Sequence, residues 1–114
     1  MKRPATSHYI HSYVHLGRVG VLLEFGLDTH LTEKATAFQQ LATDLCLQIA
    51  AQDPRDVADL LGQSFLKVPS TSVGEHMGQT ATALEDRIEI TRFTRWEAPK
   101  FKKDDELAPF QKRY

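Results

Sequence analysis

The stretch that decides the fold is residues 18–54, RVGVLLEFGLDTHLTEKATAFQQLATDLCLQIAAQDP. Between Val19 and Leu27 every odd position is apolar, and this period of two predicts a strand with one buried face. Further along, apolar residues recur at three- and four-residue steps, at Phe38, Leu41, Ala42, Leu45 and Ile49. That spacing predicts a long helix with an apolar stripe, ending near Gln52.

The junction between this strand and this helix, residues 26–31, is where we first expect a functional feature. A strand-to-helix junction presents exposed backbone donors and adaptable side chains to a partner. Asp28 or Thr29 is also suited to cap the long helix, because both are good N-cap residues.

Residues 8–15, HYIHSYVH, predict a first strand, and Gly17 suits a hairpin turn into the next one. The histidines at positions 8, 11 and 15 raise the alternative of a metal site. His11 and His15 would share one strand face but lie about 13 Å apart, whereas zinc ligands converge at about 2 Å. We therefore favour exposed or core-edge histidines and predict no metal site.

The segments that follow the long helix are shorter. We expect Asp53 to cap a short helix that has Pro54 at its first position and ends at Gly62. Residues 63–71 are expected to form an extended connection.

A third helix and a last strand complete the pattern. Ser72 and Glu75 form the sequence signature of a capping box, which predicts a helix over 73–84. This helix gives way at residues 85–87 to a strand over 88–98, in which the apolar alternation slips. Either that strand contains a bulge or both of its faces are covered.

Composition limits the classes of function. A chain of 114 residues predicts one domain, here a core over 1–98 followed by a charged tail over 99–114. The net charge of −1 gives no case for direct nucleic-acid or membrane binding. The single cysteine, Cys46, excludes an internal disulfide and is expected to be a small core residue. With one cysteine and no disulfide, intracellular residence fits best. No apolar run approaches the roughly 18 residues of a membrane span.

Motifs for covalent chemistry are missing from the sequence. It contains no glycine-rich phosphate loop, no nucleophile elbow and no His-Glu-x-x-His helix. We therefore predict a small binding module without a cofactor, and not an enzyme.

Four segments resemble the core domain of bacterial elongation factor Ts, in the order that this family has them. They are SYVHLGRVGVLLE (12–24), DTHLTEKATAFQQLATDLCLQIAAQDPRDV (28–57), LLGQSFLKVPSTSVGEHM (60–77) and RIEITRFTRWE (87–97). Several separate signatures in one order are more specific than a single motif. The resemblance implies an α+β fold in which a three-stranded antiparallel sheet has helices packed on one face, in the order β-β-α-(α)-α-β.

The resemblance also implies partners. Proteins of this family bind elongation factor Tu and promote GDP/GTP exchange in translation elongation, by pressing a side chain against the helix that supports the magnesium site. The free face of the sheet is expected to pair with a second copy in a homodimer. The cytoplasm is the expected location, with an organelle matrix as the alternative.

The resemblance places partner contacts at Asp28, Thr29, His30, Leu31, Tyr13, His15, Val73 and Gly74. The family's Thr-Asp-Phe signature stands here as Thr29-His30-Leu31, so an imidazole replaces a carboxylate and an aliphatic group replaces an aromatic ring. The family's N-terminal helical module is expected to be absent, and its long helical insertion to be reduced to the short helix 54–61. These departures leave a second interpretation open: a non-exchanging interaction or dimerisation module that docks in another assembly.

Overall fold

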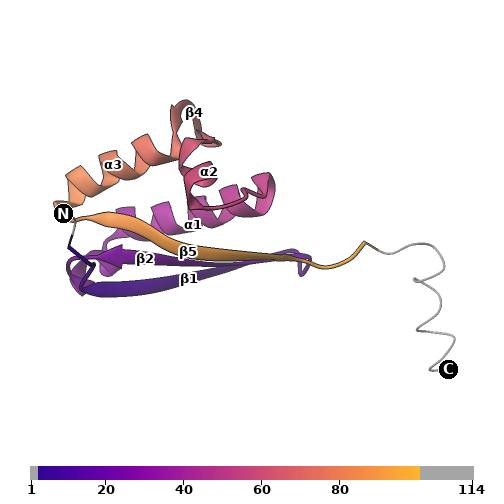
Figure 1. Ribbon diagram of the computed structural model, residues 1–114, viewed down its shortest axis with the longest axis horizontal. Coiled ribbons are helices and arrows are strands. Elements are labelled where there is room, and N and C mark those ends of the chain that lie inside the picture. Colours follow the sequence, from indigo (N-terminus) through magenta and orange to yellow (C-terminus); the bar gives the residue numbers. More distant parts are fainter. Residues whose placement is uncertain (1–2, 101–114) are drawn as a thin grey trace, which may run out of the picture.

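The computed structural model describes residues 3–100, which form a sheet with helices packed over one face (Figure 1). The antiparallel sheet consists of β1 (Ser7–His15), β2 (Val19–Leu27) and β5 (Ile88–Glu97), in the order β1-β2-β5. The helices are α1 (Thr36–Gln52), α2 (Val57–Gly62) and α3 (Val73–Leu84). The predicted α+β fold is therefore confirmed, with its three-stranded antiparallel sheet and its helices on one face.

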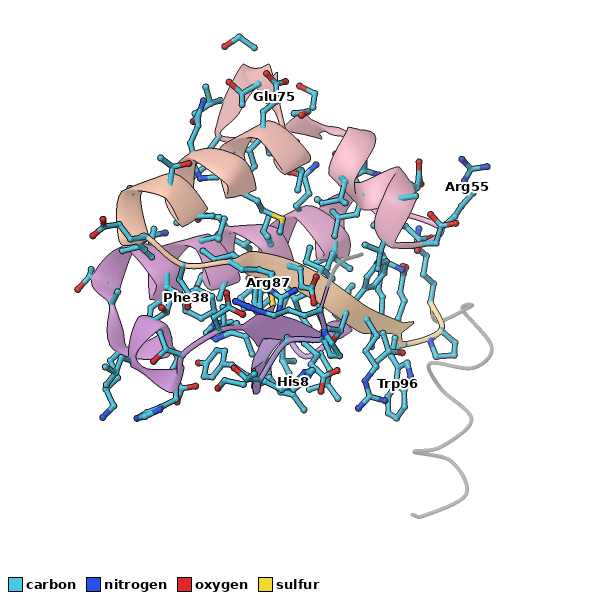
Figure 2. All side chains as sticks on the ribbon, turned by 60° about the vertical axis from the view of Figure 1, so that its left-hand side comes forward. His8, Phe38, Arg55, Glu75, Arg87 and Trp96 are labelled. Carbon is cyan, nitrogen blue, oxygen red and sulfur yellow. The ribbon has the colours of Figure 1, made fainter. Side chains whose placement is uncertain are left out.

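The core lies between the central strand and α1, as the two sequence periods predict. Leu23, Phe25 and Leu27 on the inner face of β2 are fully buried. The ring of Phe25 meets that of Phe38 on α1 edge to face, with 5.0 Å between ring centroids. Full burial of each such side chain contributes about 1.5–3 kcal/mol. Figure 2 shows Phe38 on the helix side of the sheet.

The start of the long helix differs from the prediction. Thr29 caps a 3₁₀ helix, η1 (His30–Lys34), and its hydroxyl accepts a hydrogen bond from the Leu31 amide at 3.2 Å. The long helix α1 begins only at Thr36, after Ala35, whose backbone is extended and offers no side-chain cap. The 3₁₀ turn closes through the bond from the Ala35 amide to the Thr32 carbonyl, and this bond ends the first helical segment.

The expected cap of the second helix is also wrong. Asp53 has a positive φ of 47° and ends α1, with its amide donating to the carbonyl of Ile49. A left-handed residue suits a helix C-terminus, whereas an N-cap needs an extended backbone. Helix α2 starts at Val57, four residues after Asp53, so Pro54 is not its first residue as predicted. The cap is Asp56, whose carboxylate accepts from the Asp59 amide at 2.8 Å. Its end at Gly62 is as predicted.

The predicted extended connection over 63–71 is a small hairpin of its own, formed by β3 (Ser64–Phe65) and β4 (Val68–Ser72). The buried amide of Gln48 on α1 supports it. Its nitrogen donates to the carbonyl of Ser64, and its oxygen accepts from the amide of Leu66, both at 3.0 Å. Nothing in the local pattern of 63–71 signals a partner that far back in the chain.

Helix α3 has the predicted capping box. The Ser72 hydroxyl accepts from the Glu75 amide, and the Glu75 carboxylate accepts from the Ser72 amide, both at 3.1 Å. The helix ends at Leu84, and Glu85 follows it in the left-handed conformation with φ of 53°.

A bulge explains the slipped alternation of the last strand. Glu24 pairs with Arg92 and Phe25 with Ile90, so Thr91 is the extra residue. The bulge puts Phe93 on the inner face together with Ile90 and turns Trp96 to the outer face. Figure 2 shows Trp96 on the side of the sheet that faces away from the helices.

Two further predictions are partly covered by the described residues. Within residues 3–100, the structure has no helix that is both long enough and apolar enough to cross a membrane. Of the predicted tail over 99–114, residues 101–114 lie outside the described part of the chain.

Cys46 is fully buried on α1, as expected for a small core residue. Burial raises the pKa of the Cys46 thiol from its ordinary value of 9.0 to about 12. The stability that this shift contributes is complete below pH 9, where the thiol is protonated in both the folded and the unfolded chain. It is lost as the pH rises from 9 towards 12.

We therefore expect a thiol reagent at pH 8 to label Cys46 only after the chain is unfolded in denaturant. The free energy of unfolding should fall by at most about 1.4 kcal/mol per pH unit above pH 9 on this account. Cys46→Ala is the control, because it should remove this part of the alkaline decline in a urea titration. Labelling of the native chain as fast as of the unfolded chain would contradict the buried position.

Candidate partner-binding site

The junction residues named from the sequence lie at one end of the sheet, directly after β2. Leu31 is 62% exposed and His30 is exposed as well, whereas the neighbouring Thr32 is only 7% exposed. The short helix η1 thus turns one side chain inward and presents an imidazole and an isobutyl group to solvent. An exposed leucine on a turn at a chain reversal is suited to enter an apolar pocket of another protein.

Asp86, in the connection between α3 and β5, holds this turn from inside the molecule. Its Oδ1 accepts from the amide of Asp28 at 3.0 Å. Its Oδ2 accepts from the hydroxyl of Thr32 at 2.5 Å and from the amide of Thr29 at 3.4 Å. One carboxylate therefore satisfies the donors of two junction amides and of the inward-turned threonine.

The pKa of Asp86 reflects these contacts. Burial by itself raises the pKa of this carboxyl, but the hydrogen bonds from the Thr32 hydroxyl and from the amides of Asp28 and Thr29 lower it. The net result is a pKa below its ordinary value. Asp86 therefore stays ionised at neutral pH, and its contribution to stability is lost only as the pH falls through this depressed pKa.

Asp28 is engaged within the chain. Its carboxylate binds the guanidinium of Arg87 at 2.9 Å and that of Arg3 at 3.1 Å. Its carbonyl oxygen accepts from the Thr6 hydroxyl at 2.7 Å. The Arg87 side chain is 17% exposed and also donates to the carbonyl of Arg3. The N-terminal segment is thereby tied to the junction, and Asp28 acts first as a structural residue.

The other residues named from the sequence lie elsewhere. The Tyr13 hydroxyl bonds to Nδ1 of His15 at 2.6 Å, and Tyr13 pairs with Val21 in the sheet. Six residues of strand separate Val21 from Leu27, so this pair is about 20 Å from the junction. The structure does not bring the Tyr13–His15 pair and the junction together.

The start of α3 is separate as well. Val73 is fully buried, so its side chain forms part of the core and offers no surface to a partner. This is a correction to the expected contact, and its cause is the packing of the first turn of α3 over the core. Gly74 lies against Leu61, because a Cβ at this position would be 3.3 Å from the Leu61 carbonyl oxygen. The helix length of 12 residues puts both about 18 Å from the junction end.

The sequence patterns did not identify Asp86 or Arg87 as site residues. Both stand in the polar run 85–87, which signals only a break between α3 and β5. Asp86 acts on a residue 58 positions earlier in the chain, and no local spacing reveals such a pair. The available signal was weak: an acidic residue directly after a helix, where macrodipole effects would favour a basic one.

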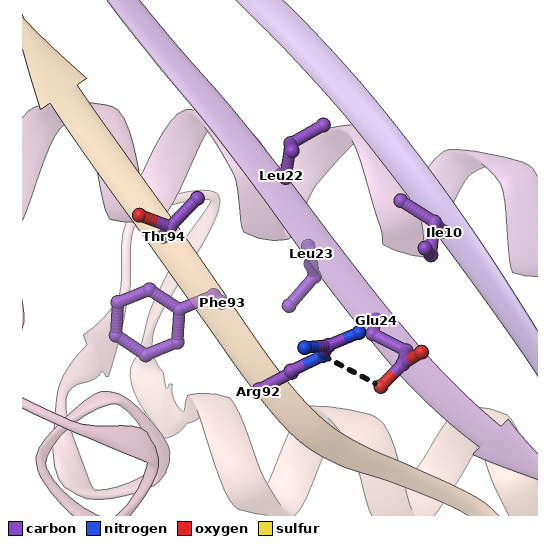
Figure 3. A pocket seen from close by; sticks show the side chains of 7 residues that line it. All are labelled: Ile10, Leu22, Leu23, Glu24, Arg92, Phe93 and Thr94. Carbon is purple, nitrogen blue, oxygen red and sulfur yellow. Dashed lines mark hydrogen bonds and ion pairs between the residues drawn. The ribbon is translucent and has the colours of Figure 1, made fainter.

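A second surface lies on the outer face of the sheet, which the described residues leave uncovered. Four apolar side chains, each more than half exposed, form what we term the free-face patch: Ile10, Val14, Leu22 and Trp96. A hollow of about 340 Å³ lies beside Ile10 and Leu22, with the ion pair of Glu24 and Arg92 at its rim (Figure 3). Apolar patches of this kind often mark protein–protein interfaces.

Histidines and acidic residues in the described part of the chain do not converge on a metal geometry. Within residues 3–100 no three His, Cys, Asp or Glu side chains gather closely enough to hold an ion. His11 instead bonds through Nδ1 to the Tyr9 hydroxyl and through Nε2 to the Thr43 hydroxyl, both at 3.1 Å. Burial lowers the pKa of His11, which favours its neutral form.

Comparison with known proteins gives a consistent result. Elongation factor Ts of Nostoc punctiforme is 34% identical over 92 residues, which are 80% of this chain and 29% of that protein. Elongation factor Ts of Alkaliphilus oremlandii is 26% identical over 140 aligned positions, covering 83% of this chain and 65% of that protein. Elongation factor Ts of Myxococcus xanthus is 25% identical over 153 positions, covering 93% of this chain and 70% of that protein. The chain is related to elongation factor Ts. No family model matches the sequence.

The alignments also show a difference from elongation factor Ts. The one with the Alkaliphilus protein runs over 140 positions, whereas 83% of 114 residues is about 95 residues. About 45 positions of that elongation factor Ts are therefore opposite gaps in this chain. A reduced internal insertion is expected to give such gaps on the side of this chain. The chain spans 29% of the Nostoc protein and 65% of the Alkaliphilus protein.

The exposure of Leu31 leads to a test by substitution. Leu31→Ala is expected to change the free energy of unfolding by less than about 0.5 kcal/mol, because a solvated side chain loses little packing. Leu27→Ala, four residues earlier at the buried end of β2, should cost about 2–5 kcal/mol. Urea denaturation of both variants measures the difference. A large loss in Leu31→Ala would mean that Leu31 supports the fold.

Proposed function

We propose that this chain binds elongation factor Tu through η1 and promotes exchange of GDP for GTP on it. The observation that carries the proposal is the exposed Leu31, held outward at the position where the resemblance places the aromatic residue of the family signature. The relatives named elongation factor Ts support an elongation-factor-Ts-like role in translation. The proposed place of action is the cytoplasm.

The proposed mechanism needs no covalent step. Leu31 enters an apolar pocket of Tu and displaces the helix that supports the magnesium site, which weakens the contacts of the metal and the affinity for GDP. This is a linkage between two ligands of one protein, so GDP in turn weakens binding of this chain. A leucine fills less volume than an aromatic ring, and His30 cannot accept hydrogen bonds as a carboxylate does. We therefore expect exchange to be slower than with the Thr-Asp-Phe signature.

The proposal is tested with Tu from the same source, loaded with a fluorescent GDP. The chain should accelerate GDP release, and Leu31→Ala should reduce the acceleration by about tenfold, as for a central interface residue. Leu66→Ala is the matched control, because Leu66 is an exposed leucine on the β3–β4 hairpin. The double variant His30→Asp with Leu31→Phe should exchange faster than the natural chain.

Binding to Tu without acceleration of GDP release would overturn the exchange proposal. It would favour the second function, a docking module of the same fold. The observation behind that alternative is the replaced signature at Thr29-His30-Leu31, together with the about 45 positions of the Alkaliphilus protein that lie opposite gaps in this chain.

We further propose that the free-face patch pairs two copies of the chain in a homodimer. Leu22 lies at its centre, opposite Ser12 and Thr94, and Trp96 lies opposite Gly20, which has no side chain to cover the sheet. A hollow of about 160 Å³ next to Trp96 and Leu22 is therefore available to a side chain of the other copy. The charges at the rim are balanced by the Glu24–Arg92 ion pair, so two identical faces do not repel each other strongly.

Sedimentation at micromolar concentration should give a mass near twice 12.9 kDa. Leu22→Glu should yield monomers, because it places an unpaired charge at the centre of the interface. Leu66→Glu is the control, with the same change on an exposed leucine of the β3–β4 hairpin, and should remain dimeric. A monomeric natural chain, or a dimer unaffected by Leu22→Glu, would exclude this interface.

A further inference from the structure

Asp86 occupies its place because of the way α3 ends. Glu85 adopts the left-handed conformation, and its amide donates to the carbonyls of Ala81 and Thr82. The amide of Asp86 then donates to the carbonyl of Ala81 at 3.2 Å. These bonds fix the backbone directly before β5, so the carboxylate of Asp86 extends from a rigid helix end.

The turn that receives this carboxylate is weak on its own. A 3₁₀ helix of five residues has poor hydrogen-bond geometry, and its first donors have no partner within the helix. The Thr29 hydroxyl accepts from the Leu31 amide, and Asp86 accepts from the amides of Asp28 and Thr29, which directly precede η1. The orientation of the turn therefore depends on a group from another part of the chain.

Thr32 links the buried and the exposed side of the turn. Its hydroxyl donates to Asp86 from a position that is 7% exposed, and the adjacent Leu31 is 62% exposed. Neighbouring side chains on a 3₁₀ helix point about 120° apart, since it has about three residues per turn. Fixing Thr32 inward consequently fixes Leu31 outward.

We propose that Asp86 is the positioning residue of Leu31, which holds η1 in the orientation that a protein partner binds, without contacting that partner. The inference rests on the proposed function, because the partner contact at Leu31 belongs to it. Asp86 thereby lowers the entropic cost of binding, because a turn that is already ordered loses less conformational entropy when Tu is bound. Arg87 supports the same arrangement through Asp28, at the other side of the junction.

The test is a double-mutant cycle of Asp86→Asn and Leu31→Ala in the full chain, with affinity for GDP-free Tu as the readout. Asp86→Asn should weaken binding about tenfold when Leu31 is present, a difference that corresponds to about 1.4 kcal/mol. It should weaken binding less than about twofold in the Leu31→Ala background, because coupled residues are not additive. Glu85→Gln is the matched control, with the same loss of charge one residue earlier, and should leave the affinity unchanged.

A second measurement does not depend on Tu. Asp86→Asn should speed hydrogen exchange at the amides of Asp28 and Thr29, while the amide of Phe25 in the core stays protected. Thr32→Val, which removes the hydroxyl donor and keeps the shape, should act in the same direction. This second variant decides the question if Asp86→Asn folds poorly.

The outcomes separate the inference from the proposed function. An equal loss of affinity in both backgrounds, or unchanged exchange at the junction amides, would overturn the positioning role of Asp86. If Leu31→Ala leaves the affinity for Tu unchanged, the proposed binding site fails. Hydrogen exchange then decides by itself whether Asp86 orders the turn.

Discussion

The packing of β2 on α1 is the constraint from which the rest of the structure follows. Phe25 and Phe38 meet edge to face at 5.0 Å, in a core that has Leu23 and Leu27 fully buried beside them. Since β2 is the central strand, covering its inner face places all helices on one side and leaves the outer face open. The chain must also reverse direction between Leu27 and Thr36, and η1 makes that reversal.

The reversal exposes the side chain of Leu31 and also requires support for a short 3₁₀ helix. A short 3₁₀ turn cannot satisfy its own first donors. The carboxylate of Asp86 holds the turn from outside: it accepts from the amides of Asp28 and Thr29 directly before η1 and from the Thr32 hydroxyl within it. The Arg87–Asp28 ion pair ties the same junction to the start of β5. The junction is thus assembled from chain segments that are 58 residues apart, and it exposes Leu31 to solvent. Stability and proposed recognition depend on the same contacts here.

Local rules predicted most elements and failed where a distant contact decided. The capping box of Ser72 and Glu75 and the strand over 19–27 were recognisable because their signals lie within a few residues. The start of α1 was not recognisable, because a residue such as Thr29 can cap a 3₁₀ helix as well as an α-helix. The hairpin over 64–72 was missed because its support, Gln48, stands on α1. Among the residues of the candidate site, the resemblance names Leu31, whereas no local sequence pattern names Asp86.

The sequence by itself determined the periods of β2 and α1, the identity of the junction residues and the relation to elongation factor Ts. These are properties of neighbouring residues, and a repeat of two or of three to four positions fixes which side of an element is apolar. Tertiary structure alone decided that the bulge at Thr91 turns Trp96 to the open face and that Val73 is buried. It also decided that Asp86 reaches η1. The reason is physical. Strand register and the acceptors that bind free backbone donors depend on which distant segments come into contact, and a local sequence pattern does not contain that information.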